Sequence, residues 1–232
     1  MSDIFKREDD TAQPRHLFSP YASTIKRAPL HRLIPIPQTI TETTGPSGSW
    51  EDLMGGAMAD MTRQHKGEPL GQRIIVSGRV LDENERPVPG TVIEIWQANA
   101  AGRYIHQRDN WPAPLDPNFT GVGRVVSDKM GRYRYITVRP GAYPWGNHYN
   151  AWRPSHIHLS LLGPTFATRL VTQMYFPDDP LVPLDPIANS VSMPYRDRMV
   201  SRFDIDTTEP NFALGYLFDI VLRGRHATPL EA

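Results

Sequence analysis

The sequence predicts an all-β protein, and more specifically a β-sandwich of mixed strands with long loops. Three observations lead to this prediction. Proline occurs 23 times and glycine 17 times among the 232 residues, which makes long helices hard to place. From residue 72 onwards, short apolar runs alternate with turn signals, a pattern typical of a β-sandwich. No apolar run approaches the roughly 20 residues that a membrane-spanning helix needs.

The predicted strands are short runs with alternating apolar side chains, bounded by turn residues. One of them follows a turn centred on Gly131. The others cover residues 72–82, 91–99, 155–163, 168–176 and 212–224. Between the strands lie the long segments 99–123, 139–154 and 177–211, and loops of this length in a compact sandwich often carry function.

For residues 1–71 the sequence predicts a different structure, namely an extended N-terminal arm that ends in a short helix or loop. The arm is polar and interrupted by prolines, so it needs another surface to lie on. A solvated tail is the alternative, but a tail has no use for the apolar residues of APLHRLIPIPQTI, 28–40. We therefore expect the arm to pack on a partner chain and residues 72–232 to form the globular domain.

Charge and composition exclude several classes of function. The 25 basic and 25 acidic residues give a formal net charge of zero and form no long block of one sign, which argues against nucleic acids and membrane surfaces as partners. The absence of cysteine excludes disulfides, thiolate nucleophiles and zinc–thiolate sites. The opening MSDIFKREDD is charged where a signal peptide is apolar, so we expect a soluble, cytoplasmic protein.

Two histidines, His156 and His158, form the first candidate site. They lie two residues apart in a strand-like run, where alternate side chains point to the same face of the sheet. Two imidazoles on one face make a natural metal clamp. A structural role is the alternative, and it is the more common one for an isolated His-x-His pair in a strand.

The segment 143–158, which ends in this pair, is rich in rings and prolines and contains one guanidinium group, Arg153. A pocket for a flat aromatic ligand has this composition, with apolar walls and a few placed polar groups. Trp145 and Trp152 are equally well explained as core anchors of a packed loop. A packed loop does not, however, explain why a charged residue, Arg153, stands directly before the strand that carries the two histidines.

Tyrosine is the candidate for further metal ligands, because the histidine pair has neither cysteine nor carboxylate beside it. A phenol has a pKa of about 10 and binds as phenolate, so near neutral pH the metal must offset about three pKa units, roughly 4 kcal/mol. Ferric iron is a strong enough Lewis acid. Physics alone does not choose two of the nine tyrosines. Tyr104 and Tyr143 are favoured because they lie in loops, whereas Tyr133, Tyr135 and Tyr175 lie in strand-like runs.

The chain resembles the intradiol ring-cleavage dioxygenases over nearly all of its length beyond the arm, and in parts of the arm. The specific element is the spacing of two tyrosines from the His-x-His pair, with Tyr143 thirteen residues before His156. The matching segments are TITETTGP (39–46), RIIVSGRVLDENERPVPGTVIEIWQANAAGRY (73–104), APLDPNFTGVGR (113–124), RPGAYPW (139–145), WRPSHIH (152–158) and FDIVLRG (218–224).

This resemblance implies a transthyretin-like sandwich topology and an Fe(III) centre. Tyr104 and His156 match the family's equatorial ligands, and Tyr143 and His158 match its axial ligands. Tyr143 also matches the ligand that is displaced by the substrate and acts as a base. The resemblance thus implies which two of the tyrosines bind the metal.

The resemblance also implies residues that contact the substrate or act near it. Arg153 matches an arginine that stabilises negative charge on the bound substrate, and Gln173 matches a residue near the oxygen pocket. Trp145 and Ile187 match wall positions. Tyr21 matches a tyrosine near the substrate carboxylate.

The implied activity is the cleavage of protocatechuate (3,4-dihydroxybenzoate) with O2 to 3-carboxy-cis,cis-muconate, in the degradation of aromatic compounds. The implied partner is a homologous α chain without iron ligands, in αβ units of a larger oligomer. A homo-oligomeric enzyme for catechol or hydroxyquinol is one alternative, although the proline-rich arm lacks the helical dimerisation segment of such enzymes. A non-catalytic transthyretin-like binding module is another, but it would not need all four ligands and Arg153.

Overall fold

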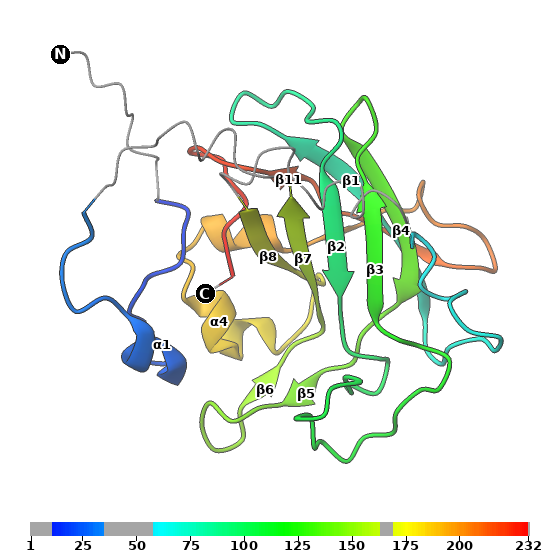
Figure 1. The fold of residues 1–232 in the computed structure, drawn as a ribbon, viewed down its shortest axis with the longest axis horizontal. Coiled ribbons are helices and arrows are strands. Elements are labelled where there is room, and N and C mark those ends of the chain that lie inside the picture. Colours follow the sequence, from blue (N-terminus) through cyan, green and yellow to red (C-terminus); the bar gives the residue numbers. More distant parts are fainter. Residues whose placement is uncertain (1–10, 35–57, 163–168, 232) are drawn as a thin grey trace.

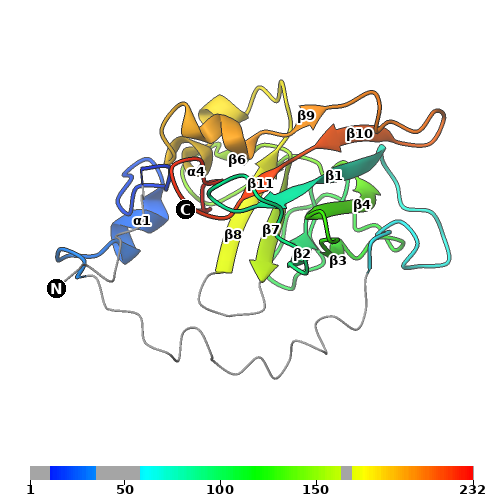
Figure 2. The same ribbon diagram turned by 90° about the horizontal axis from the view of Figure 1, so that it is seen from above.

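A computed structural model of the chain describes residues 11–34, 58–162 and 169–231. Two β-sheets pack against each other; α4 lies near β8, and α1 lies farther out on the same side of the sheets (Figures 1 and 2). The fold class predicted from proline content and strand pattern is therefore confirmed. Within the described ranges, none of the helices is long and apolar enough to cross a membrane.

The first sheet is built around the longest strand, β1 (Arg73–Leu81). On one side β1 pairs antiparallel with β4 (Arg132–Val138). On the other side it pairs parallel with β10 (Leu214–Leu217) and then with β11 (Ile220–Val221). The short β9 (Arg202–Phe203) lies antiparallel to β10.

The second sheet has the order β3 (Val122–Val126), β2 (Val92–Trp96), β7 (His156–Leu162) and β8 (Arg169–Tyr175). All neighbouring strands in it are antiparallel. The two-stranded ribbon of β5 (Tyr143–Pro144) and β6 (Trp152–Arg153) leads into β7. The predicted loop 139–154 thus contains a small hairpin just before the histidine strand.

The hydrophobic core lies between the two sheets and explains the direction of the β7 side chains. Ile157, Leu159 and Leu161 are fully or almost fully buried among apolar side chains of β1, β2 and β4. Because side chains alternate along a strand, His156 and His158 emerge on the opposite face of the sheet. The core therefore fixes which face carries the candidate site.

Short helices occupy the N-terminal segment and the predicted loop 177–211. They are α1 (Ala22–Arg27), η1 (Val182–Leu184), α4 (Pro186–Asn189) and η2 (Tyr195–Met199). A small second core packs Ala188, Val191 and Met199 against Tyr175 of β8. This core holds the N-terminus of α4 beside the second sheet.

Several sequence predictions can be compared with these elements. The turn at Gly131 is confirmed, with a φ of 70°. Strand β3 was missed, because its first residues fall in the segment 99–123 that we assigned to a loop. The short helix or loop predicted at the end of the arm is described only from Met58 onwards, where the chain forms turns and two isolated β-bridges. Residues 51–57 and the matching segment 39–46 lie outside the described residues.

The prediction of one strand over 212–224 is wrong, because β10 and β11 are separated at Phe218 and Asp219. The Phe218 carbonyl accepts a hydrogen bond from the buried Tyr133 hydroxyl. The Asp219 carboxylate accepts one from the backbone N–H of Arg79, at 2.8 Å. Opposite the break, Gly78 of β1 lets the Phe218 carbonyl approach closely, since a Cβ there would lie 2.0 Å from that oxygen.

The substitution Gly78→Ala tests this contact. The neighbouring oxygen belongs to the backbone, so the added methyl group can be accommodated only if the strands shift. We expect the free energy of unfolding to fall by about 1–3 kcal/mol, the usual cost of overpacking, in urea denaturation. Gly146→Ala is the matched control, because nothing lies within 4 Å of its Cβ position. Equal losses in the two variants would contradict the role of Gly78.

Candidate metal centre

Four aromatic rings from three parts of the chain meet on the outer face of β7. The rings of Tyr104 and Tyr143 lie edge to face, with centroids 5.5 Å apart. The Tyr143 ring lies 5.6 Å from that of His156, which lies 4.8 Å from that of His158. The structure thus brings together all four predicted ligands, in one continuous cluster. Within the described residues, no group of three or more His, Cys, Asp or Glu side chains could hold a metal ion.

Hydrogen bonds fix the tautomer of both histidines. The Nδ1 atom of His156 lies 2.7 Å from the Pro154 carbonyl oxygen, and that of His158 lies 2.9 Å from a carboxylate oxygen of Glu231. Both partners are acceptors, so each Nδ1 carries the proton and each Nε2 keeps its lone pair. The Nε2 of His156 lies 3.3 Å from the Tyr143 hydroxyl oxygen, inside the ring cluster.

The protonation of these rings suits a cation of high charge. Burial, with help from Arg153 and His158, holds the pKa of His156 well below its usual value, so the ring is neutral at pH 7. Burial, followed by the neighbouring Tyr143, raises the pKa of Tyr104 well above 10, and the Tyr104 hydroxyl is buried without a hydrogen-bond partner. A buried, unpartnered phenol beside two neutral imidazoles fits a ligand whose partner is a strongly charged metal ion.

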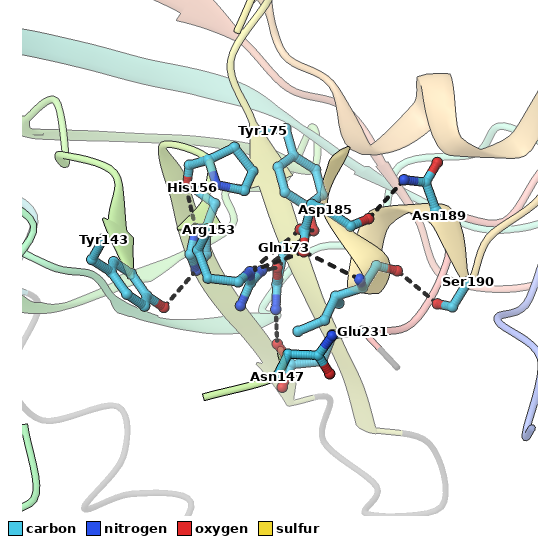
Figure 3. Close-up of polar contacts among 12 residues, drawn as sticks. Tyr143, Asn147, Arg153, His156, Gln173, Tyr175, Asp185, Asn189, Ser190 and Glu231 are labelled. Carbon is cyan, nitrogen blue, oxygen red and sulfur yellow. Dashed lines mark hydrogen bonds and ion pairs between the residues drawn. The ribbon is translucent and has the colours of Figure 1, made fainter. Parts of the chain in front are cut away.

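Arg153 lies next to this cluster, beside Gln173 and Asp185 (Figure 3), and it is buried. Its Nε atom lies 3.3 Å from the Asp185 carboxylate, and its terminal NH2 group donates to the side-chain oxygen of Gln173. The Tyr175 hydroxyl lies within hydrogen-bond distance of the same two partners, 2.8 Å from the Gln173 oxygen and 3.1 Å from the Asp185 carboxylate, and its single proton serves one of them at a time. Burial alone would lower the pKa of Arg153, but Tyr175, Asp185 and Tyr143 raise it above its ordinary value, so the guanidinium stays charged.

The N-terminal segment reaches the same site. The ring of Tyr21, the residue before α1, lies 5.6 Å from that of Trp145, and the Arg153 guanidinium lies 5.6 Å from the centre of the same Trp145 ring. Asn147 ties this segment to the β5–β6 hairpin, since its side chain accepts from the Ala22 N–H and donates to the Pro20 carbonyl, both at 2.8 Å. Trp145, a predicted wall residue, is therefore in contact with Tyr21, the residue predicted to lie near the substrate carboxylate.

Ile187, the other predicted wall residue, is buried in α4. Its connection to the site runs through Asp185, which caps α4 by accepting the Ile187 N–H at 3.2 Å. The cap is the carboxylate that also pairs with Arg153. The structure thus links this position to the guanidinium, while a contact of its side chain with substrate stays a prediction.

Comparisons with known proteins identify the family to which the chain belongs. The model described as "Dioxygenase" matches residues 45–224, and the model described as "Protocatechuate 3,4-dioxygenase beta subunit N terminal" matches residues 5–39. A protocatechuate 3,4-dioxygenase beta chain of Burkholderia cepacia is 54% identical over 98% of this chain and 97% of its own length. The chain belongs to the intradiol ring-cleavage dioxygenase family.

Other members of the intradiol dioxygenase family are more distant. A protocatechuate 3,4-dioxygenase alpha chain of Pseudomonas putida is 28% identical over 83% of this chain and 95% of its own length. The solved structure of a hydroxyquinol 1,2-dioxygenase from Pseudomonas putida DLL-E4 superposes with a TM-score of 0.54, at 26% identity, covering 76% of this chain and 61% of that one. Iron is the metal that this family uses.

Four residues of this dioxygenase site were not found from the sequence: Trp96, Tyr175, Asp185 and Glu231. Trp96 lies opposite His158 in the β2–β7 ladder, and the two rings stack with centroids 4.8 Å apart. Tyr175 was placed in a strand-like run and is buried in the second core, but its hydroxyl also belongs to the Arg153 network. A strand-pairing argument could have found Trp96 and Tyr175, but Asp185 and Glu231 have no local pattern that marks them.

Asp185→Ala tests the support of Arg153 in this dioxygenase. The side chains of Arg153 and Asp185 are 5% and 0% exposed, so the variant leaves a buried cation without its counter-ion. We expect a loss of about 3–5 kcal/mol in the free energy of unfolding, measured by urea denaturation. Glu209→Ala removes a carboxylate from a half-exposed pair with Arg134 and should cost about 0–1 kcal/mol. Similar losses in both variants would refute this role for Asp185.

Proposed function

We propose that this chain is the iron-bearing subunit of a protocatechuate 3,4-dioxygenase, which cleaves protocatechuate with O2 to 3-carboxy-cis,cis-muconate. The observation that carries the proposal is the cluster of Tyr104, Tyr143, His156 and His158, in a chain that is 54% identical over almost its whole length to a beta chain of such an enzyme. Those four side chains would hold Fe(III). A homologous α chain would complete the αβ unit.

Ferric iron, when bound, would supply the Lewis acidity that binds both catechol oxygens and makes the ring reactive towards O2. The chain's own groups have separate tasks. The Tyr143 oxygen, in its phenolate form, is the candidate to accept a proton from the entering substrate, because it lies within the cluster, 3.3 Å from His156 Nε2. Burial raises the pKa of Tyr143, which makes its phenolate a stronger base, while the nearby Arg153 opposes this shift. Arg153 would place a fixed positive charge where negative charge develops, and its network holds that charge without reorganisation.

The substrate would lie between the ring cluster and the N-terminal segment. Trp145 and Tyr21 offer flat apolar surfaces for an aromatic ring, and Gln173 accepts a hydrogen bond from Arg153. Ile187 is proposed as a further wall residue on the α4 side. A carboxylate on the substrate, as in protocatechuate, would require a polar or charged partner, which Tyr21 or the α chain could provide.

Oxygen uptake with protocatechuate and with catechol, measured side by side, tests the proposed function. We expect protocatechuate to be consumed when the chain is co-expressed with a homologous α chain, and the protein to have the red-brown colour of phenolate bound to Fe(III). Preference for catechol by the chain alone would favour the homo-oligomeric alternative. A colourless, inactive protein after purification with iron supplied would refute both enzymatic functions.

His158→Ala tests the ligand set directly. The variant removes one Nε2 donor from the cluster, so we expect most of the iron to be lost in elemental analysis of the purified protein. His226→Ala is the matched control, because this exposed ring lies away from the cluster, beside Arg198. Full iron content in His158→Ala would remove His158 from the ligand set.

Tyr143→Phe separates iron binding from proton transfer. The variant keeps the ring and its contacts with Tyr104 and His156 but loses the hydroxyl. We expect measurable iron to remain, a visible absorption band that is weaker or shifted, and a turnover number reduced by about 10²–10⁴-fold, the usual contribution of general base catalysis. Unchanged turnover in oxygen uptake would exclude the proposed role of this hydroxyl.

A further inference from the structure

The last described segment of the chain, residues 227–231, connects the two sheets on the side of the metal centre. Thr228 exchanges hydrogen bonds with Val221 of β11, at 2.9 and 3.0 Å. On β8, the Thr172 hydroxyl donates to the Pro229 carbonyl at 2.7 Å, and the Glu231 N–H donates to the Val171 carbonyl at 2.9 Å. The segment is therefore held at both ends, and the side chain of Glu231 is directed towards the site.

One carboxylate oxygen of Glu231 accepts two hydrogen bonds. The first comes from His158 Nδ1 at 2.9 Å, and the second comes from the Gln173 side-chain NH2 at 3.1 Å (Figure 3 shows the second). His158 and Gln173 are cross-strand partners on β7 and β8, so their side chains leave the same face of the sheet. Glu231 lies over this pair and binds both.

The bond to Gln173 decides which way its amide group points. Because the NH2 end donates to Glu231, the oxygen end faces Arg153 and the Tyr175 hydroxyl, which are both donors. The reversed amide would turn its NH2 group towards these two donors and its oxygen towards a carboxylate. Glu231 thus acts on Arg153 through one intermediate side chain.

The bond to His158 completes the fixation of that ring. Trp96 stacks on its face at 4.8 Å, with an angle of 5° between the planes, and this sets the plane of the ring. Stacking alone leaves the ring free to turn over within that plane. Only a hydrogen bond at the edge distinguishes the two nitrogens, and Glu231 provides it at Nδ1.

We propose that Glu231 is a positioning residue of the metal centre. It holds His158 as the Nδ1–H tautomer, so that Nε2 is offered to the iron, and it orients Gln173 so that the amide oxygen steadies Arg153. This inference rests on the proposed function, since it assigns Glu231 to the same iron site. Residues that orient a histidine ligand in this way typically contribute a factor of about 10–100 in metal affinity or activity.

Two substitutions separate the hydrogen bonds of Glu231 from its charge. Glu231→Ala removes the acceptor for both His158 and Gln173. Glu231→Gln keeps one side-chain oxygen that can accept both bonds, but it carries no charge. Glu83→Ala is the control, because Glu83 is a carboxylate in a partly exposed pair with Arg223 and has no contact with the site.

The experiment measures iron release to a ferric chelator, the visible absorption spectrum of the iron-loaded protein, and the Tm of the metal-free protein. We expect Glu231→Ala to bind iron about 10–100-fold more weakly than the wild type and to shift the absorption band. The iron affinity of Glu231→Gln should lie between those of Glu231→Ala and the wild type, and the iron affinity of Glu83→Ala should match the wild type. The metal-free Tm of Glu231→Gln should stay close to that of the wild type.

Other outcomes would overturn the inference in distinguishable ways. If Glu231→Ala keeps the wild-type iron affinity and spectrum, or changes only the metal-free Tm, Glu231 has no positioning role. If Glu231→Ala does not fold, Glu231→Gln decides the question. Weaker iron binding by Glu231→Gln than by the wild type would support a role for the Glu231 charge. A wild-type iron affinity and spectrum in Glu231→Gln would count against that role. A wild-type protein that binds no iron at all would instead refute the proposed function.

Discussion

The buried charge of Arg153 is the constraint on which the rest of the site depends. Removing a guanidinium from water costs several kcal/mol unless acceptors surround it. Here the acceptors come from β8, through Gln173, and from the N-cap of α4, through Asp185. Asp185 also caps α4, so the short helix and the cation stabilise each other. The segment 177–211 therefore supplies a counter-charge that the two sheets could not provide.

Strand β7 joins the core to the site. Its Ile157 and Leu159 are packed between the sheets, while His156 and His158 leave the opposite face. The positions of the histidines are thus fixed by the same packing that holds the sandwich together, and a site on a rigid strand is more exact than one on a loop. Tyr104 and Tyr143 come from connecting segments, so their side-chain positions are less constrained than those of the histidines. The edge-to-face contact between the two tyrosine rings restricts their positions in part.

The sequence was informative where geometry is local. Alternation along a strand put His156 and His158 on one face without any structure, and the fold class followed from turn signals and proline content. Selecting Tyr104 and Tyr143 needed the family resemblance, because loop residues have no period. Asp185 and Glu231 were not predictable, since they lie 32 and 73 residues from the side chains they bind. Their roles come from tertiary contacts alone.

The N-terminal segment is bound to this chain in one part and exposes large apolar side chains in the next. Its first described part is bound to this chain, through Asn147 at Pro20 and Ala22 and through Gln13 at Leu230. The part that follows carries large apolar side chains, such as Leu30, which is 94% exposed. A surface of this kind is stable when it is covered, and a homologous α chain is the partner expected in an αβ unit. Tyr21 lies within the bound part and contacts Trp145, so the segment that we propose to pack on the α chain also borders the proposed iron site.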